Sequence, residues 1–129
     1  MYVIFYHKNC LDGLAAVWAV WSHFKQVDIR TRHWIRLGDA KGLAVHAPPE
    51  FSNELGHELA KESGTFGVSY QFDGTNQRWF FAIRSTGDYD VGAIAKLYGG
   101  GGHKNAAGFS VNLETFFRLM EEACILGNS

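Results

Sequence analysis

Four consecutive glycines, Gly99 to Gly102, are the feature of this 129-residue sequence that most restricts its fold. Glycine reaches positive φ without strain and lets other atoms approach the backbone closely. Successive backbone N–H groups in such a loop can form a concave site for an anion. His103 and Asn105 follow directly, and the small residues 106–108 permit tight packing behind the loop. The run therefore predicts a phosphate-binding loop, and a flexible surface loop is the alternative.

The sequence on both sides of this loop predicts an α+β unit. Residues 66–72 and 77–84 are β-like runs around an Asp-Gly pair, which predicts a β-hairpin. Helices are expected at residues 54–62, 91–98 and 114–126. Ser52 or Asn53 is the expected cap of the first helix and Gly64 its end, and Asp88 or Asp90 is the expected cap of the second. The last helix is expected to bury Phe116, Phe117, Met120, Ala123 and Cys124.

The N-terminal part of the chain has the pattern of a βαβ unit. Residues 2–6 form a short apolar run typical of a buried strand, residues 14–24 predict a buried helix, and residues 27–35 alternate like a second strand. Residues 37–49 contain two glycines and two prolines and are expected to be a connection. The predicted fold is thus α/β, with a βαβ unit at 1–38 packed on an α+β domain at 51–129, and a linker at 39–50.

Composition and charge narrow the classes of partner. The formal net charge is −1, with 12 basic and 13 acidic residues. This balance disfavours long nucleic acid, whose phosphates usually require a basic excess, but it leaves a small anionic ligand open. No apolar stretch has the length of a membrane span. Cys10 and Cys124 form no disulfide framework, and no signal peptide is visible, so the expected location is the cytoplasm.

The segment DVGAIAKLYGGGGHKNAAGF closely resembles the signature of the DHH-associated domain, the C-terminal, substrate-binding half of many DHH phosphoesterases. Upstream, NELGHELAKESG resembles that domain's opening helix, and FFAIRS resembles its strand ending in Arg-Ser, so the resemblance covers residues 51–111. It implies that phosphate or nucleotide is held by Arg84, Ser85, Gly100, Gly101, Gly102 and His103, to which the neighbouring Asn105 is added as a candidate.

The start of the chain resembles another part of the same superfamily. YHKNCLDGLAAVWA is similar to the first motif of the DHH catalytic domain, with Leu11 where proline is usual. The resemblance implies that His7 and Asp12 occupy positions that bind divalent metal, typically manganese. The other ligands of the family are missing, since the sequence contains no Asp-His-His triplet and no adjacent pair of histidines. A two-metal phosphoesterase needs several such ligands, so the chain is expected to be an internally deleted form.

The loop from His7 to Gly13 remains a candidate for ligand binding. It follows the expected strand and precedes the expected helix, where α/β sheets usually bind ligands and a helix end favours anions. Lys8 and Asn9 are placed to reach a phosphate or a base edge. A structural or phosphate-facing role for His7 and Asp12 is favoured over metal binding, because their partner ligands are absent.

These observations favour a protein that binds a small nucleotide, cyclic or linear, without cutting it. It would need no cofactor and would act as a sponge, as phage proteins do against bacterial immune signals, in the cytoplasm of the host cell. A homo-oligomer is expected, because a two-stranded βαβ fragment cannot cover both of its faces. The alternatives are a minimal phosphoesterase that uses manganese, and a regulatory or assembly module with a purely structural glycine loop.

Overall fold

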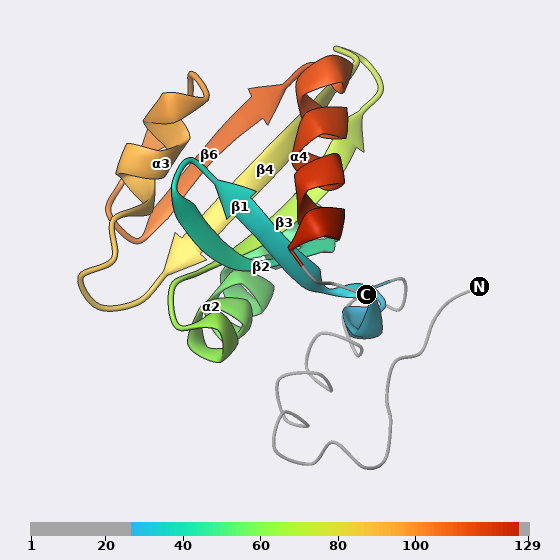
Figure 1. The fold of residues 1–129 in the computed structure, drawn as a ribbon. Helices are drawn as coiled ribbons and strands as arrows, with labels where there is room; N and C mark the ends of the chain where they lie inside the picture. Colours follow the sequence, from blue (N-terminus) through green and yellow to red (C-terminus); the bar gives the residue numbers. More distant parts are fainter. Residues whose placement is uncertain (1–26, 127–129) are drawn as a thin grey trace.

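A computed structural model describes residues 27–126, which form a mixed sheet flanked by helices on both faces (Figure 1). The strands are β1 (His33–Leu37), β2 (Ala40–His46), β3 (Phe66–Asp73), β4 (Arg78–Ser85), β5 (Gly101–Gly102) and β6 (Ala106–Val111). The helices are α2 (Ser52–Ser63), α3 (Val91–Leu97) and α4 (Leu113–Ile125), with 3-10 turns η1 (Ile29–Thr31) and η2 (Pro49–Phe51). The strand order is β1-β2-β3-β4-β6-β5. Among the strands of residues 27–126, only β2 and β3 pair in parallel, and α2 connects them.

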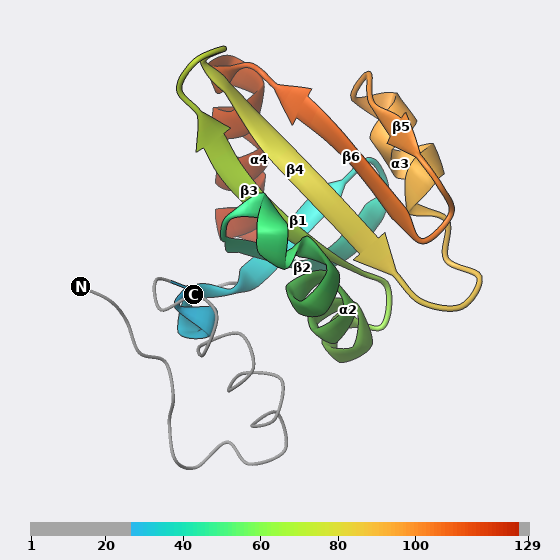
Figure 2. The same ribbon diagram turned by 180° about the vertical axis from the view of Figure 1, so that it is seen from behind.

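Helices α3 and α4 lie on one face of the sheet, and α2 lies on the other (Figures 1 and 2). The core on the α3–α4 side includes Phe66, Phe81 and Ile83, which are fully buried. A second core on the α2 side joins Val45 of β2 to Leu59 of α2. The predicted α/β class is confirmed, and within residues 27–126 no helix is long and apolar enough to cross a membrane.

The predicted hairpin is confirmed as β3 and β4, which pair antiparallel from Phe66 opposite Ser85 to Asp73 opposite Arg78. The connection is longer than a two-residue turn. The Asp73 carboxylate accepts hydrogen bonds from the backbone N–H of Thr75 at 3.0 Å and from Nδ2 of Asn76 at 2.8 Å. These bonds hold the loop in a defined shape.

The strand predicted at residues 27–35 is shorter and lies further along the chain. Residues 29–31 form the turn η1, in which the Asp28 carboxylate accepts a hydrogen bond from the Arg30 N–H at 3.0 Å. Strand β1 begins only at His33 and continues to Leu37. Alternation alone suggested a longer strand, but a local side-chain bond to the backbone competes with strand pairing here.

The prediction that residues 37–49 are a connection is wrong, because β2 occupies residues 40–46. Gly38 has φ +62° and makes the tight turn between β1 and β2. Gly42 lies inside β2, where an added Cβ would come within 2.6 Å of the Phe66 ring. In a strand, glycine can mark a close approach of neighbouring atoms, so this glycine is a packing feature and not a loop signal.

The helix boundaries agree with the predictions better than the caps do. Helix α2 starts after η2 with Phe51 at its N-cap, so neither Ser52 nor Asn53 caps it, whereas Gly64 ends it with φ +82° as predicted. Asp90 caps α3, accepting a hydrogen bond from the Ala93 N–H at 3.2 Å. In α4, Phe116 and Ala123 are buried, but Phe117 is 61% exposed and Cys124 is exposed, so the predicted buried side is wrong at these two positions.

The predicted strand at residues 2–6 and the predicted helix at residues 14–24 lie outside the described residues. They make up most of the expected N-terminal unit. The division of the chain into units at 1–38 and 51–129 therefore stays a prediction.

Candidate functional site

The two faces of β4 differ in what covers them. Phe81 and Ile83 point into the core below α3 and α4. The alternate residues Phe80, Ala82 and Arg84 therefore point to the opposite face, because successive side chains of a strand alternate. Figure 2 shows this face, where α2 lies over one end of β3 and β4 and leaves the surface of β4 and β6 uncovered.

A cavity of about 380 Å³ lies on this open face between the start of α2 and β5. We call it the Arg84 pocket. Its lining comprises Pro49, Ser52, Phe80, Ala82, Arg84, Gly101, Gly102, Ala106, Ala107 and Gly108. Its volume falls within the range of about 300–1,000 Å³ that is usual for small-molecule sites. Small residues from β4, β5 and β6 form much of its surface, so a ligand could approach the backbone of the sheet closely.

Arg84 is held in this pocket by contacts with α2 and its own strand. Its Nε donates to Oδ1 of Asn53 at 2.8 Å, and Nη1 donates to the carbonyl of Ile83 at 2.9 Å. Its stem passes directly over Gly56, where an added Cβ would lie 2.5 Å from Cγ of Arg84. Glycine in the middle of a helix is unfavourable, and here it provides the space for this side chain.

The charge of Arg84 is not balanced locally. Burial lowers the pKa of its guanidinium from the ordinary value, but arginine stays protonated near neutral pH. Among residues 27–126, no carboxylate lies within ion-pair distance of it. A partly buried guanidinium with unused donors is suited to bind the oxygens of a phosphate or carboxylate.

The glycine run forms regular hydrogen bonds with α3 and β6. Gly99, with φ +87°, ends α3: its N–H donates to the Lys96 carbonyl at 3.2 Å, and the Gly100 N–H donates to the Ala95 carbonyl at 2.9 Å. This pair of bonds is the Schellman motif. The next two residues form β5 and pair with β6. The segment is therefore the end of a helix followed by a short strand.

The amides of the run are not all available to an anion. Gly99 and Gly100 donate to helix carbonyls, and the His103 N–H donates to the Ala106 carbonyl at 2.7 Å. A continuous row of free N–H groups, as the sequence suggested, is not present. Gly101 and Gly102 line the Arg84 pocket, and because they have no side chains they leave space in it.

Ser85 and Asn105 connect the turn after β5 to the segment before α3. The buried Ser85 hydroxyl donates to the Tyr89 carbonyl at 2.6 Å and accepts from Nδ2 of Asn105 at 3.0 Å. The Val91 N–H donates to the Lys104 carbonyl at 2.8 Å, which ties the start of α3 to the turn after β5. Ser85 and Asn105 thus position the turn after β5, and neither of them lines the Arg84 pocket.

The structure brings together only part of the predicted site. Arg84, Gly101 and Gly102 line the Arg84 pocket. Gly100 packs against β6, and His103 lies exposed in the turn after β5. The predicted ligand-binding residues His7, Lys8, Asn9 and Asp12 lie outside the described residues.

Sequence reasoning missed the partner of Arg84 and the pocket wall formed by Phe80 and Ala82. The sequence indicates Asn53 only as a possible helix cap, but it lies one residue after the helix begins and bonds to Arg84 of β4. The alternation in QRWFFAIR was a signal for Phe80, since it places Phe80 on the same face as Arg84. Within residues 27–126, no three His, Cys, Asp or Glu side chains are grouped as a metal ion would require.

Comparison with known proteins supports the resemblance in the C-terminal part. Residues 49–125 match the family described as the DHHA1 domain, so the match begins just before α2 and extends through α4. An uncharacterized protein of Acanthamoeba polyphaga mimivirus is 38% identical over 65 residues. That alignment covers 48% of this chain and 15% of the viral protein, so this chain is similar to a small part of a much longer relative.

Proposed function

Because the chain belongs to the DHHA1 domain family, we propose that it binds a small nucleotide in the Arg84 pocket and does not cleave it. The observation that carries this proposal is the guanidinium of Arg84, which Asn53 orients and no described carboxylate neutralises. A bound phosphate would supply the missing negative charge. The small residues around it leave room for the ligand to lie against β5 and β6.

The absence of cleavage is proposed from the sequence. If the chain is an internally deleted DHH protein, His7 and Asp12 are what remains of the metal-binding motif, and the rest of the ligand set is missing. A two-metal phosphoesterase uses paired metal ions to stabilise both the attacking and the leaving oxygen. A protein without the metal ligands could still bind a nucleotide, because the lining of the Arg84 pocket includes neither His7 nor Asp12.

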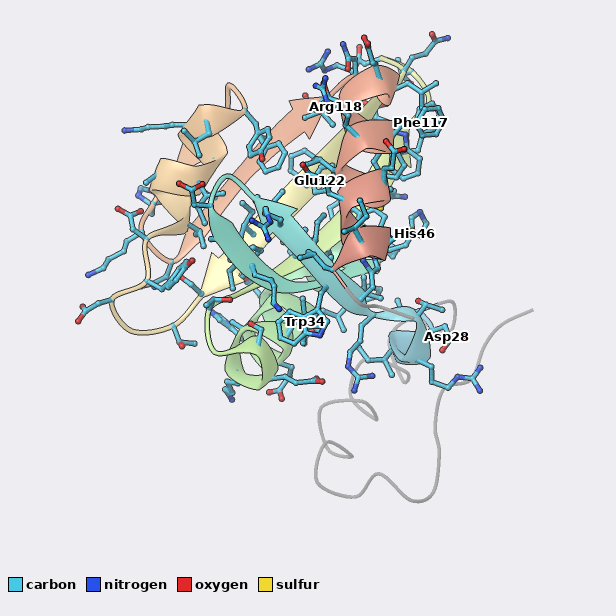
Figure 3. All side chains as sticks on the ribbon, viewed as in Figure 1. Asp28, Trp34, His46, Phe117, Arg118 and Glu122 are labelled. Carbon is cyan, nitrogen blue, oxygen red and sulfur yellow. The ribbon has the colours of Figure 1, made fainter. Side chains whose placement is uncertain are left out.

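Replacing Arg84 tests binding. We expect Arg84→Ala to weaken nucleotide binding by about tenfold or more, since one charge-assisted contact contributes on the order of 1.5–3 kcal/mol. Isothermal titration calorimetry with nucleoside monophosphates and dinucleotides measures the effect. Arg118→Ala is the matched control, because it removes the same charge from α4 on the opposite face of the sheet (Figure 3). Equal affinity of the wild type and Arg84→Ala would contradict the proposal.

A manganese-dependent phosphoesterase is the alternative activity. Incubation of the protein with nucleotides and manganese, followed by denaturation and chromatography, distinguishes the two. Recovery of intact ligand supports binding without cleavage. Turnover that disappears in His7→Ala or Asp12→Ala would establish the enzyme instead.

In the cell, a binder of this kind would lower the free concentration of its ligand. We propose that it sequesters a nucleotide signal, such as a cyclic nucleotide of bacterial immunity, as a phage-encoded sponge in the host cytoplasm. We also propose that it acts as a homo-oligomer. Native mass spectrometry of protein purified from cells measures the stoichiometry and the mass of any nucleotide that co-purifies. A monomer without nucleotide would count against both proposals.

A further inference from the structure

The turn between β1 and β2 contacts the C-terminal end of α3, although the two segments are far apart in the sequence. The N–H of Gly38 donates a hydrogen bond to Oη of Tyr98 at 2.8 Å, and these residues are 60 positions apart. An added Cβ on Gly38 would lie 2.6 Å from Cδ1 of Leu97, so the turn lies directly against the last residues of α3. Figures 1 and 2 both show the tip of this hairpin beside α3. The contact joins a turn outside the family match to a helix within it.

The core fixes the ring of Tyr98 independently of its hydroxyl. The ring stacks on Phe109 of β6, with 4.6 Å between centroids and 18° between planes. Phe109 is buried and stacks in turn on Phe81 of β4 at 4.9 Å and 6°. A phenylalanine at position 98 could make the same stack. The hydroxyl is therefore the part of Tyr98 that reaches beyond the core, and it supplies the acceptor for a backbone N–H of the β1–β2 turn.

Tyr98 also stands directly before the glycine run. An added Cβ on Gly100 would lie 2.5 Å from Cβ of Phe109, the residue that supports the Tyr98 ring. Gly101 and Gly102 then pair with β6 and line the Arg84 pocket. The backbone of glycine is conformationally permissive, so the run by itself does not determine where this wall of the pocket lies. The position of Tyr98, at which the chain leaves α3, sets where the wall begins.

We propose that Tyr98 is a positioning residue of the Arg84 pocket. Its hydroxyl holds the end of α3 against the β1–β2 turn, and this contact keeps Gly101 and Gly102 where they leave room for a phosphate beside Arg84. The inference rests on the proposed function, because it assumes that the pocket binds a nucleotide phosphate. It adds that nucleotide affinity depends on a turn that precedes the matched domain.

Tyr70 provides a matched control, because it stands at the other end of the same row of rings. Its ring stacks on Phe81 at 5.5 Å and 25°, and its hydroxyl lies 2.8 Å from Nε2 of His33 in β1. It also contacts Phe116 of α4, and neither Tyr70 nor His33 lines the Arg84 pocket. Loss of this hydroxyl removes a bond between the row of rings and β1 without touching the glycine run.

The first test measures binding on the full chain. The wild type, Tyr98→Phe and Tyr70→Phe are titrated by calorimetry with the same nucleoside monophosphates and dinucleotides as Arg84→Ala. We expect Tyr98→Phe to bind about threefold to tenfold more weakly than the wild type, as the loss of one neutral hydrogen bond would produce. Tyr70→Phe should bind within about twofold of the wild type. Urea unfolding at neutral pH should show a loss of stability in both variants, so a difference in affinity between them does not come from stability alone.

The second test needs no ligand. Amide hydrogen exchange of the free proteins, measured by mass spectrometry, reports how often a segment opens. We expect residues 99–102 to exchange faster in Tyr98→Phe than in the wild type or in Tyr70→Phe. Unchanged exchange of this segment in Tyr98→Phe would show that the hydroxyl does not hold the glycine run, and would overturn the proposal.

The outcomes separate this inference from the proposed function. Equal affinity of the wild type and Tyr98→Phe would overturn the role of Tyr98 and leave the Arg84 pocket as a nucleotide site. Equal losses of affinity in Tyr98→Phe and Tyr70→Phe would also overturn it, because they would show a general effect of stability. If the wild type binds none of the nucleotides, the proposed function fails, and the role of Tyr98 in binding fails with it.

Discussion

At the scale of single residues, neighbouring glycines of the run 99–102 meet different demands. Gly99 has a positive φ that the end of α3 requires. An added Cβ on Gly100 would collide with the carbonyl oxygen of Gly108, and one on Gly102 would lie 2.6 Å from the Ala106 carbonyl oxygen. Gly101 has neither constraint, since a Cβ there would meet nothing within 4 Å. The fold therefore does not require a glycine at this position, which lines the Arg84 pocket.

Substitution of two adjacent glycines separates folding from binding. Gly100→Ala should destabilise the protein by about 1–3 kcal/mol, because the strands must move apart to admit the methyl group. Gly101→Ala should change stability by less than about 0.5 kcal/mol. Its methyl group projects into the Arg84 pocket, so we expect nucleotide affinity to fall. Urea unfolding and titration calorimetry measure the two effects, and a stable Gly101→Ala variant with full affinity would place the ligand elsewhere.

Tyr70 is expected to make the free energy of unfolding fall at alkaline pH. It is buried in β3, with its hydroxyl 2.8 Å from Nε2 of His33, and burial raises its pKa from 10.0 to about 12. In the unfolded chain the pKa returns to about 10. Between these values the unfolded chain has lost a proton that the folded chain keeps, so the free energy of unfolding falls as the pH rises.

The expected loss between about pH 10 and pH 12 is on the order of 2–3 kcal/mol, since each pKa unit corresponds to about 1.4 kcal/mol. Urea unfolding at several pH values in this window measures the slope. Tyr70→Phe has no proton to lose at this position, so its stability should fall less steeply. Parallel curves for the two proteins would show that Tyr70 is not the responsible group.

At the scale of elements, the buried side of α4 packs on the sheet and includes an aromatic stack. The rings of Phe116 and Trp79 are 3.9 Å apart between centroids and nearly parallel, at 5°. Phe116 also contacts Tyr70 and Phe81 at 5.9 and 6.3 Å between centroids. The next residue, Phe117, points away from the sheet and is 61% exposed (Figure 3). One step along a helix rotates the side chain by about 100°, which explains the contrast.

Replacement of the two adjacent phenylalanines of α4 should therefore lower the stability of the protein by very different amounts. Phe116→Ala should destabilise the protein by about 3–5 kcal/mol, because it leaves a cavity among aromatic rings. Phe117→Ala should change stability by about 0.5 kcal/mol or less. Thermal unfolding followed by near-ultraviolet circular dichroism measures both, since Trp79 reports on the stack. Similar losses in the two variants would mean that Phe117 is covered in solution, as an oligomer interface would do.

At the scale of the whole molecule, the sheet extends beyond the family match. The match begins at Pro49, but β1 and β2 precede it: β2 pairs with β3, and β1 pairs with β2. Leu43 and Val45 of β2 are buried against α2. The residues before the matched domain thus complete its core on this side.

A chain that begins at Pro49 should lose this support. It lacks β1 and β2, so α2 loses part of its apolar contact and the edge of β3 becomes unpaired. We expect such a fragment to unfold at a lower temperature than the full chain, or without a cooperative transition, in a circular dichroism melt. A fragment that melts like the full chain would show that the matched domain is stable alone.

The sequence predicted the hairpin, the three helices and the end of α2 at Gly64, because each has a local signal in periodicity or in a turn residue. It missed β2, since Gly42 within this strand looks like a loop residue until Phe66 is placed beside it. It also placed Phe117 on the buried side of α4, because an apolar residue in a helix does not indicate how wide the covered face is. These errors share one cause, which is that the deciding contact comes from a distant part of the chain.

For the candidate site, the sequence alone determined the glycine run, Arg84 at the end of its strand and the small residues that follow, because these depend on local backbone geometry and residue size. Only the tertiary structure decided which of them face one cavity. It placed Arg84 beside Asn53 in the pocket that Gly101 also lines, and it joined Ser85 and Asn105 by a hydrogen bond outside that pocket. Such neighbourhoods depend on strand order and register, which join residues that are far apart in the sequence.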